Sequence, residues 1–131
     1  MNEFIWPLRV YIEDTDAGGI VYYVNYLKFM ERARTECLRA LGFDKQYIFN
    51  NDMMFVVASA NVNYYAPAQL DDELTVCTVA TKVARSYIVM RQEVYRGEQK
   101  LCGGDIKVAC VDRAMRPSPM PADMRQALLQ Q

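Results

Sequence analysis

The segment spanning residues 13–26, EDTDAGGIVYYVNY, holds the side chains best suited to chemistry in this chain. Two carboxylates, Asp14 and Asp16, precede a pair of glycines and an aromatic-rich stretch. A carboxylate can serve as a nucleophile, or as a general base that deprotonates water. Asp beside Gly is also common in turns and at helix N-termini. We therefore expect one of these aspartates to react and the other to cap.

The chain contains no histidine, which limits the possible mechanisms. Ser-His-Asp and Cys-His catalysis and H-E-x-x-H metal sites are all excluded. The cysteines form no C-x-x-C pair and have apolar neighbours, so we expect buried, reduced thiols instead of disulfides or a zinc site. They are Cys37, Cys77, Cys102 and Cys110. The chemistry must use carboxylates, hydroxyls, amines and backbone dipoles, and we expect neither a metal nor a cofactor.

A long helix is predicted directly after the acidic segment. Apolar residues recur at three- and four-residue spacing from about Val24 to Leu41, and Gly42 is a typical stop. Charged residues, Arg34 among them, fill the opposite side, which we expect to face solvent. The first N–H groups of a helix have no internal acceptor and carry partial positive charge. Amides near residues 23–25 could therefore polarise a carbonyl oxygen.

This combination of carboxylate and helix N-terminus suits acyl transfer to water. The carboxylate would attack the carbonyl carbon or deprotonate water, while the amides stabilise the oxyanion. Alkoxide and amine leaving groups need an acid to protonate them, whereas a thiolate leaves readily near neutral pH. A site without histidine is therefore best matched to a thioester.

Composition places the chain among small globular proteins. Its 131 residues are predicted to form a single domain, residues 1–131. A net charge of -1 provides no general attraction to nucleic acid or to anionic membranes. No apolar run approaches the length of a membrane span, and the N-terminus lacks the pattern of a signal peptide. We therefore expect a cytoplasmic protein with no membrane insertion.

Alternating apolar residues predict the strands. Phe4 to Ile12 is predicted as the strand that leads into the acidic segment. Four more strands are expected after the helix, at residues 55–65, 73–84, 86–96 and 100–111. This order predicts an α+β fold with an antiparallel sheet and one central helix.

Shorter features complete this prediction. Residues 43–52 are expected to be irregular or a short helical turn, and Gly97-Glu98 to form a tight hairpin. Gly103-Gly104 predicts a bulge or a close approach of another backbone. A short tail helix is expected from Pro121 to about Leu129.

The segments YIEDTDAGGIVY (11–22) and NYLKFMERARTE (25–36) resemble the 4-hydroxybenzoyl-CoA thioesterase family, particularly its Tol-Pal-associated acyl-CoA thioesterase branch. FVV (55–57), YYAPA (64–68) and LDD (70–72) match as well, so the resemblance covers nearly the whole chain. It implies a hot-dog fold, in which an antiparallel sheet of about five strands wraps around the long helix. It also implies a homodimer or homotetramer with active sites between subunits.

The resemblance implies that the protein is an acyl-CoA thioesterase and suggests roles for particular residues. Asp16 would be the catalytic carboxylate, as nucleophile or general base, and the backbone amide of Tyr23 would polarise the thioester carbonyl. Gly19 and Asn25 would shape the same loop as substrate-binding residues. Many members of the Tol-Pal-associated branch have histidine at the position of Tyr23, and a backbone donor is compatible with that difference.

The phosphates of CoA require cations, and the group Lys82, Arg85 and Ser86 is predicted to bind them. Lys100 or Arg113 are weaker candidates, and ordinary surface charge is the alternative for all of them. The acyl preference is open. Five residues could line an acyl tunnel or simply pack in the core: Met30, Met53, Met54, Phe55 and Tyr64.

Two other functions are compatible with such a fold. A hot-dog hydratase or dehydratase normally relies on histidine, which this chain lacks. A non-catalytic hot-dog protein could instead bind acyl-CoA or acyl carrier protein without hydrolysing the thioester.

Overall fold

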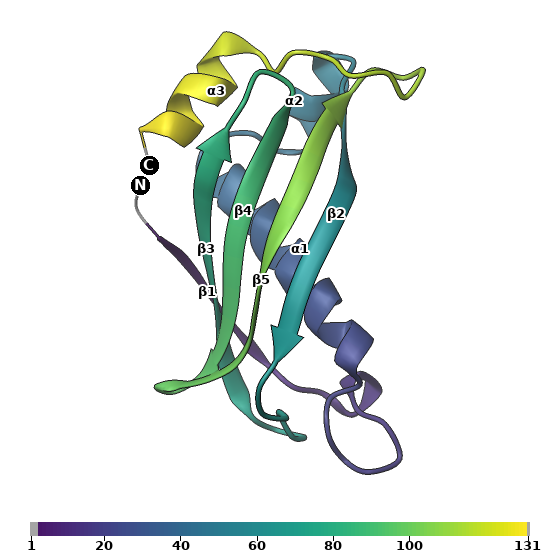
Figure 1. Ribbon diagram of the computed structural model, residues 1–131, viewed down its shortest axis with the longest axis vertical. Coiled ribbons are helices and arrows are strands. Elements are labelled where there is room, and N and C mark those ends of the chain that lie inside the picture. The colour runs from purple at the N-terminus through teal and green to yellow at the C-terminus, as the bar shows by residue number, and fades with distance from the viewer. Residues whose placement is uncertain (1–2, 131) are drawn as a thin grey trace.

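One antiparallel sheet and one long helix form the framework of the computed structural model, which describes residues 3–130 (Figure 1). The strands are β1 (Phe4–Arg9), β2 (Met54–Tyr64), β3 (Glu73–Val83), β4 (Tyr87–Arg96) and β5 (Gln99–Val111). Their order across the sheet is β1-β3-β4-β5-β2, and every neighbouring pair is antiparallel. Helix α1 (Tyr23–Ala40) runs along one face of this sheet. The predicted α+β fold is confirmed.

Apolar burial holds α1 against the sheet. Phe29, Met30 and Ala33 on its inner face are fully buried, and burial of such side chains is the main driving force of folding. Two short helices, α2 (Lys45–Asn50) and α3 (Ala122–Leu129), cover the end of the sheet beyond the C-terminus of α1. Neither these two nor α1 combines the length and hydropathy needed to cross a membrane, within residues 3–130.

A buried polar contact fixes α1 over β4. Gln92 is completely buried, and its Nε2 donates to Met30 O and to Thr78 Oγ1, both at 2.9 Å. Its Oε1 accepts a hydrogen bond from Nη1 of Arg34 at 3.0 Å. Arg34 is therefore half-buried between helix and sheet, and the prediction that it faces solvent is wrong. A buried amide needs partners, so Gln92 restricts how α1 can sit on the sheet.

The first strand is shorter than predicted. It ends at Arg9, and residues Ile12–Asp14 form a single 3-10 turn, η1. The side chain of Ile12 is 76% exposed instead of facing the core. The reason is local, because Asp14 Oδ2 accepts the N–H of Tyr11 at 2.9 Å and turns the chain away from the sheet.

The glycine pair in β5 has one of its two predicted effects. Pairing continues through Gly103 and Gly104 without a shift in register, so the predicted bulge is absent. The close approach is present, since a Cβ on Gly104 would lie 2.5 Å from the carbonyl oxygen of Asn61. Gly104 thus permits β2 and β5 to pack closely.

The cysteines do not form disulfides with one another. Cys37, Cys102 and Cys110 are buried as predicted, whereas Cys77 is half-buried. Burial raises the pKa of the Cys102 thiol to about 12, which keeps it protonated near neutral pH. Cys102 is therefore a packing residue and not a nucleophile.

Strand β2 lies at an edge of the sheet, opposite β1. None of its residues is buried, and Val57 is 53% exposed. A long edge strand with unpaired backbone groups can accept another strand, and proteins normally cover such edges.

Candidate active site

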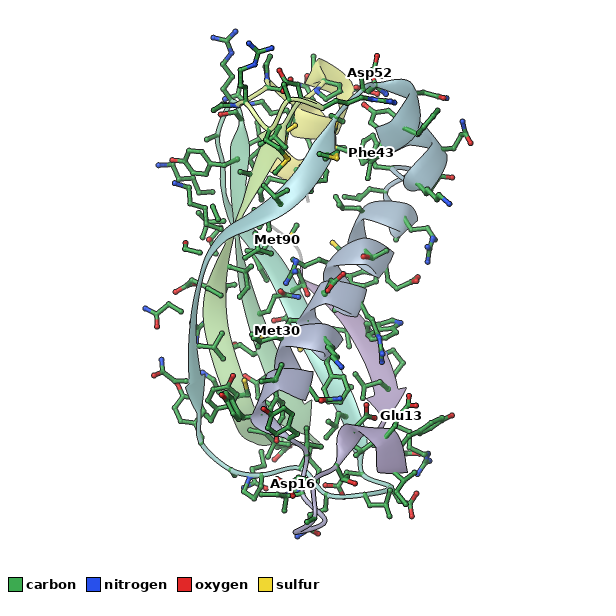
Figure 2. All side chains as sticks on the ribbon, turned by 90° about the vertical axis from the view of Figure 1, so that its right-hand side faces the viewer. Glu13, Asp16, Met30, Phe43, Asp52 and Met90 are labelled. Carbon is green, nitrogen blue, oxygen red and sulfur yellow. The ribbon has the colours of Figure 1, made fainter. Side chains whose placement is uncertain are left out.

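The acidic segment forms a small loop between η1 and α1. Thr15 and Val21 pair across its base, and the N–H of Asp16 donates to Ile20 O at 3.0 Å. The N–H of Gly19 donates back to Asp16 O at 3.0 Å, closing a tight turn. Gly19 has φ +79°, a conformation that glycine adopts without strain. Figure 2 shows Asp16 in this loop, at the end of the molecule where α1 begins.

Asp16 is exposed at this turn. Its Oδ1 accepts a hydrogen bond from the N–H of Gly18 at 2.9 Å, which orients the carboxylate. Its Oδ2 meets no donor in the part of the chain that the structure describes. One carboxylate oxygen is thus held in place, while the other is available to a substrate or to water.

Asp14 and Asn25 form a buried pair beneath the loop. Asp14 is 5% exposed and Asn25 7% exposed. Asp14 Oδ1 accepts from Asn25 Nδ2 at 3.0 Å, and Asp14 O accepts from the N–H of Tyr22 at 3.0 Å. Both oxygens of this carboxylate are therefore engaged, one with Asn25 and one with Tyr11. Asp14 holds the structure together, and Asp16 is the accessible acid.

Helix α1 begins without a side-chain cap. Its N-cap, Tyr22, has φ -62° and ψ 129° and provides no side-chain hydrogen bond. The N–H groups of Tyr23 and Val24 belong to the first turn, and within residues 3–130 neither has an acceptor. Because the positive end of the helix dipole lies here, these amides suit a partially negative oxygen.

Aromatic rings surround this helix start. The ring of Tyr23 is 59% exposed and packs edge-on against Tyr22 at 5.2 Å and Tyr64 at 5.9 Å between ring centres. Tyr64, the last residue of β2, also lies 5.6 Å from the ring of Tyr26. The rings form an amphipathic wall beside the free amides. The family resemblance suggested a role for the backbone amide of Tyr23 and none for its side chain. In the structure that side chain is part of the aromatic wall.

The connection between β2 and β3 supports the loop from below. Val21 N donates to Ala68 O at 2.8 Å, and Ile20 pairs with Gln69. The N–H of Ala68 in turn donates to the hydroxyl oxygen of Tyr26 at 2.9 Å. Ala68 thus links the end of the loop to the first turns of α1.

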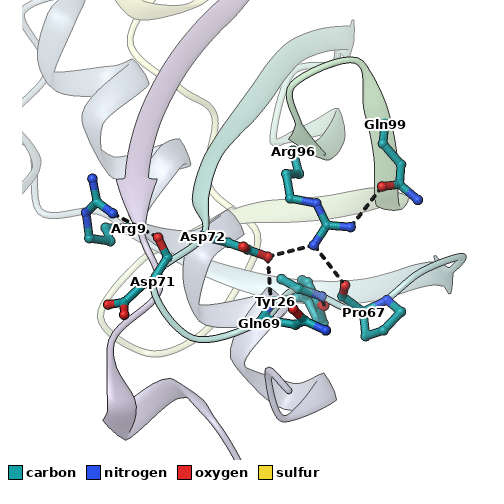
Figure 3. Close-up of polar contacts among 9 residues, drawn as sticks. Arg9, Tyr26, Pro67, Gln69, Asp71, Asp72, Arg96 and Gln99 are labelled. Carbon is teal, nitrogen blue, oxygen red and sulfur yellow. Dashed lines mark hydrogen bonds and ion pairs between the residues drawn. The ribbon is translucent and has the colours of Figure 1, made fainter. Parts of the chain in front are cut away.

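Asp72 organises this supporting connection, as Figure 3 shows. Its Oδ2 accepts from Gln69 N at 2.8 Å and from Arg96 Nη1 at 2.6 Å. Arg96 also donates to Pro67 O at 3.3 Å and to Gln99 Oε1 at 2.8 Å. Asp72 and Arg96 therefore fix the connection around Pro67 and Gln69, and this connection in turn supports the loop.

The group predicted to bind CoA phosphates lies elsewhere. Lys82 is near the end of β3, and Arg85 and Ser86 are in the connection from β3 to β4. The loop of Asp16 lies at the opposite end, where β3 begins, since Ile20 of that loop pairs with Gln69. The length of β3 separates these ends by roughly 33 Å, at about 3.3 Å per residue. The single chain does not bring them together. Lys100 and Arg113 each pair with a carboxylate of the chain.

Comparison with known proteins provides the family. The model of the Thioesterase superfamily matches residues 18–103. The acyl-CoA thioester hydrolase YbgC of Escherichia coli is 44% identical over 120 residues, which is 90% of each chain. The acyl-CoA thioesterase YbgC of Haemophilus influenzae is 43% identical over 128 residues, 96% of this chain and 94% of the relative.

The chain belongs to the thioesterase superfamily. This confirms the resemblance to the 4-hydroxybenzoyl-CoA thioesterase family and to its Tol-Pal-associated branch. The matched region of this thioesterase chain includes Gly19, Tyr23 and Asn25, and it begins after Asp16.

Solved structures confirm the hot-dog thioesterase fold. A probable thioesterase from Bartonella henselae has a TM-score of 0.88 at 31% identity, covering 92% of this chain and 100% of that one. A 1,4-dihydroxy-2-naphthoyl-CoA thioesterase from Synechocystis has a TM-score of 0.89 at 23% identity, covering 98% and 96%. The second likeness concerns the fold alone.

The acid stability of the protein should depend on Asp72. Burial acts to raise the pKa of Asp72, but hydrogen bonds from Gln69 and Arg96 and the charge of Arg96 outweigh it and keep that pKa below its usual value. A group of this kind stabilises the fold above its unfolded pKa of about 4, and the contribution is lost as pH falls through the folded value. We expect Asp72→Asn to lower the unfolding temperature near neutral pH.

Thermal unfolding followed from about pH 6 to about pH 3 measures this effect. Asp72→Asn should lose less additional stability on acidification than the wild type does. Asp71→Asn is the matched control, because the Asp71 side chain is exposed and the hydrogen bonds of this residue, to Arg9 and to Val10 O, involve its backbone. If the unfolding temperatures of the wild type and of Asp72→Asn fell equally with pH, Asp72 would not be the source of the acid sensitivity.

Proposed function

We propose that the protein hydrolyses acyl-CoA thioesters to a free acid and CoA. The observation that carries the proposal is an accessible carboxylate, Asp16, in a turn just before a helix whose first amides have no acceptor. The names of the similar Escherichia coli and Haemophilus influenzae proteins support the same reaction.

The thioester oxygen would accept a hydrogen bond from the amide of Tyr23, with the amide of Val24 alongside. These fixed donors would stabilise the negative charge that develops when the carbonyl carbon becomes tetrahedral. Such donors act without reorganisation, because the turn and the helix already hold them.

Asp16 would act in one of two ways. As a nucleophile, its free oxygen bonds to the carbonyl carbon, the C–S bond breaks, and water then hydrolyses the mixed anhydride. As a general base, it takes a proton from water, whose oxygen attacks the carbon, and the proton then passes to the departing thiolate. Both routes consume one water and release a carboxylic acid and CoA.

The other predicted site residues have supporting roles in this proposal. Gly19 permits the turn, and Asn25 fixes Asp14 beneath it; contact of either with substrate stays a prediction. Lys82, Arg85 and Ser86 would bind the CoA phosphates. Because they lie far from Asp16 in one chain, they would do so from a second copy.

We also propose that the protein acts in the cytoplasm as a homodimer or homotetramer with sites between subunits. Antiparallel pairing of two β2 edges would join two sheets into one and cover the exposed strand. The pairing would also place the Lys82 end of one copy at the same end of the assembly as Asp16 of the other.

Replacement of the catalytic acid tests the reaction. Asp16→Asn should retain the fold and lose roughly 100-fold or more in kcat on the best substrate of an acyl-CoA panel, because a positioned acid-base group is removed. Release of the CoA thiol is the measurement. Glu13→Gln, a neighbouring exposed carboxylate visible in Figure 2, should retain wild-type activity.

Mass spectrometry of the same mixtures separates hydrolysis from binding. A non-catalytic protein that holds acyl-CoA or acyl carrier protein would leave every thioester intact. Such a result, or an Asp16→Asn variant as fast as the wild type, would falsify the proposed function.

The role of the Tyr23 amide can be tested with proline. Proline has no N–H and is well tolerated at the first position of a helix, and the backbone angles of Tyr22 suit the residue before a proline. Tyr23→Pro should therefore keep the fold but lose about 100-fold in kcat, as in other sites that lose one oxyanion donor. Tyr23→Ala removes the ring and keeps the amide, and it should lose much less. Similar kcat values for both variants would contradict the role of the amide.

The proposed interface can be tested by introducing charge on β2. Ala60→Arg near the middle of the strand should shift the protein towards single chains, because two copies of the new charge would meet across the interface. Light scattering after size-exclusion chromatography gives the mass. Ile5→Arg on the opposite edge, β1, is the control. A wild-type protein with the mass of one chain would exclude this interface.

A further inference from the structure

A large cavity lies at the end of the molecule away from Asp16. It occupies about 860 Å³ between the second half of α1, α2, the start of β2 and the sheet. This volume is typical of sites for small molecules. Its lining is mainly apolar and includes Leu38, Phe43, Ile48, Met53, Met90 and Val108. In Figure 2, Phe43 and Met90 lie on opposite sides of this region.

One wall of this apolar cavity carries the half-buried cation Arg34. Its Nη1 donates to Gln92 Oε1, and Gln92 is itself fixed by Met30 O and Thr78 Oγ1. Within residues 3–130, no carboxylate lies within ion-pair distance of Arg34. Burial lowers the pKa of Arg34, and the negative charge of Glu31, which also lines the cavity, opposes this effect. A guanidinium nevertheless stays protonated in proteins.

The other arginines at this cavity are in a different situation. Arg39 pairs with Glu36, and Arg113 pairs with Asp52 at 3.1 Å while lying over the ring of Phe49. Their charges are balanced at the mouth of the cavity. Within residues 3–130 the only side-chain hydrogen bond of Arg34 is the one from Nη1 to Gln92, which leaves Nε and Nη2 as donors on a residue that lines the cavity.

We propose that this cavity takes the acyl group of the thioester substrate, and that Arg34 selects acyl groups that end in a carboxylate. The inference rests on the proposed function and names its substrate class. The planar guanidinium binds a carboxylate through two parallel hydrogen bonds. A methyl-ended acyl group would fill the apolar space but offer the half-buried guanidinium no hydrogen-bonding partner, whereas a terminal carboxylate would.

The position of the cavity suits a site shared by two copies. Arg34 lies eleven residues beyond Tyr23, about 16 Å along α1, so the cavity is remote from Asp16 of the same chain. If two β2 strands pair antiparallel about Ser59, the middle residue, Met54 of one copy lies opposite Tyr64 of the other. Tyr64 packs on Tyr23, so the cavity wall formed by Met54 would face the helix start of the second copy.

Matched thioesters test this selection. The values of kcat/KM are compared for adipoyl-CoA with hexanoyl-CoA, glutaryl-CoA with pentanoyl-CoA, and suberoyl-CoA with octanoyl-CoA. The wild type should favour the carboxylated member of at least one pair. Arg34→Met should reduce that preference about tenfold or more, mainly through KM, because a charge-assisted bidentate contact is lost. Arg34→Lys should reduce it less, since it keeps the charge without the fork.

Arg32→Met is the matched control, because Arg32 is exposed on the same helix and does not line the cavity. It should keep the wild-type preference. A wild type that favours the methyl-ended member of every pair would overturn the inference, as would an unchanged preference in Arg34→Met. If circular dichroism shows that Arg34→Met does not fold, the test rests on the kcat/KM ratios of the matched thioesters for the wild type and for Arg34→Lys.

Failure of the proposed function would look different. In that case no thioester would be hydrolysed, or Asp16→Asn would match the wild type. Hydrolysis that depends on Asp16 but shows no carboxylate preference would overturn the role of Arg34 alone.

Discussion

The buried carboxylate of Asp14 determines the geometry of the candidate site. A buried acceptor must be satisfied, and Asp14 meets this requirement with the N–H of Tyr11 and the amide of Asn25. The first bond ends the opening strand and forms η1, while the second anchors the start of α1. Asp14 is thus occupied by structural hydrogen bonds, whereas Asp16, two residues later, is exposed. The backbone of Asp14 also engages Tyr22 N, and α1 begins at the next residue with its amides free.

The two ends of α1 serve different purposes. Its N-terminus offers backbone donors at the same end of the molecule as Asp16 (Figure 2), and its second half carries Arg34 on the wall of an apolar cavity. Gln92 of β4 is bonded to Met30 and Arg34 near the middle of α1, so the helix cannot slide without breaking these hydrogen bonds. A rigid helix with donors at one end and an apolar cavity near the other is compatible with the proposed dimer, in which each copy would complete the site of its partner.

Much of the fold could be predicted from the sequence because its signals are local. The three- and four-residue periodicity and Gly42 marked α1, and the alternating segments marked the strands. The strand order β1-β3-β4-β5-β2 could not be predicted, because alternation identifies a strand without naming its neighbours. The end of β1 was wrong because side-chain bonds of Asp14 override the alternation through Ile12.

The candidate site could likewise be predicted only in part. Spacing showed that Asp14 and Asp16 lie near a helix start, but burial alone separates the structural acid from the accessible one. Arg34 looked like one member of a charged helix face, and its partner Gln92 lies 58 residues away. Contacts over such separations leave no periodic signal in the sequence. The superfamily resemblance suggested roles for Tyr23 and Asn25, which stay predictions, and gave no information on Arg34.

A crystal structure of the Asp16→Asn variant with an uncleaved acyl-CoA is the most direct test of the proposed active site at the start of α1. The thioester oxygen should lie about 3 Å from the amide nitrogen of Tyr23, with residue 16 beside the carbonyl carbon. A thioester bound away from the start of α1, with the Tyr23 amide facing solvent, would contradict it.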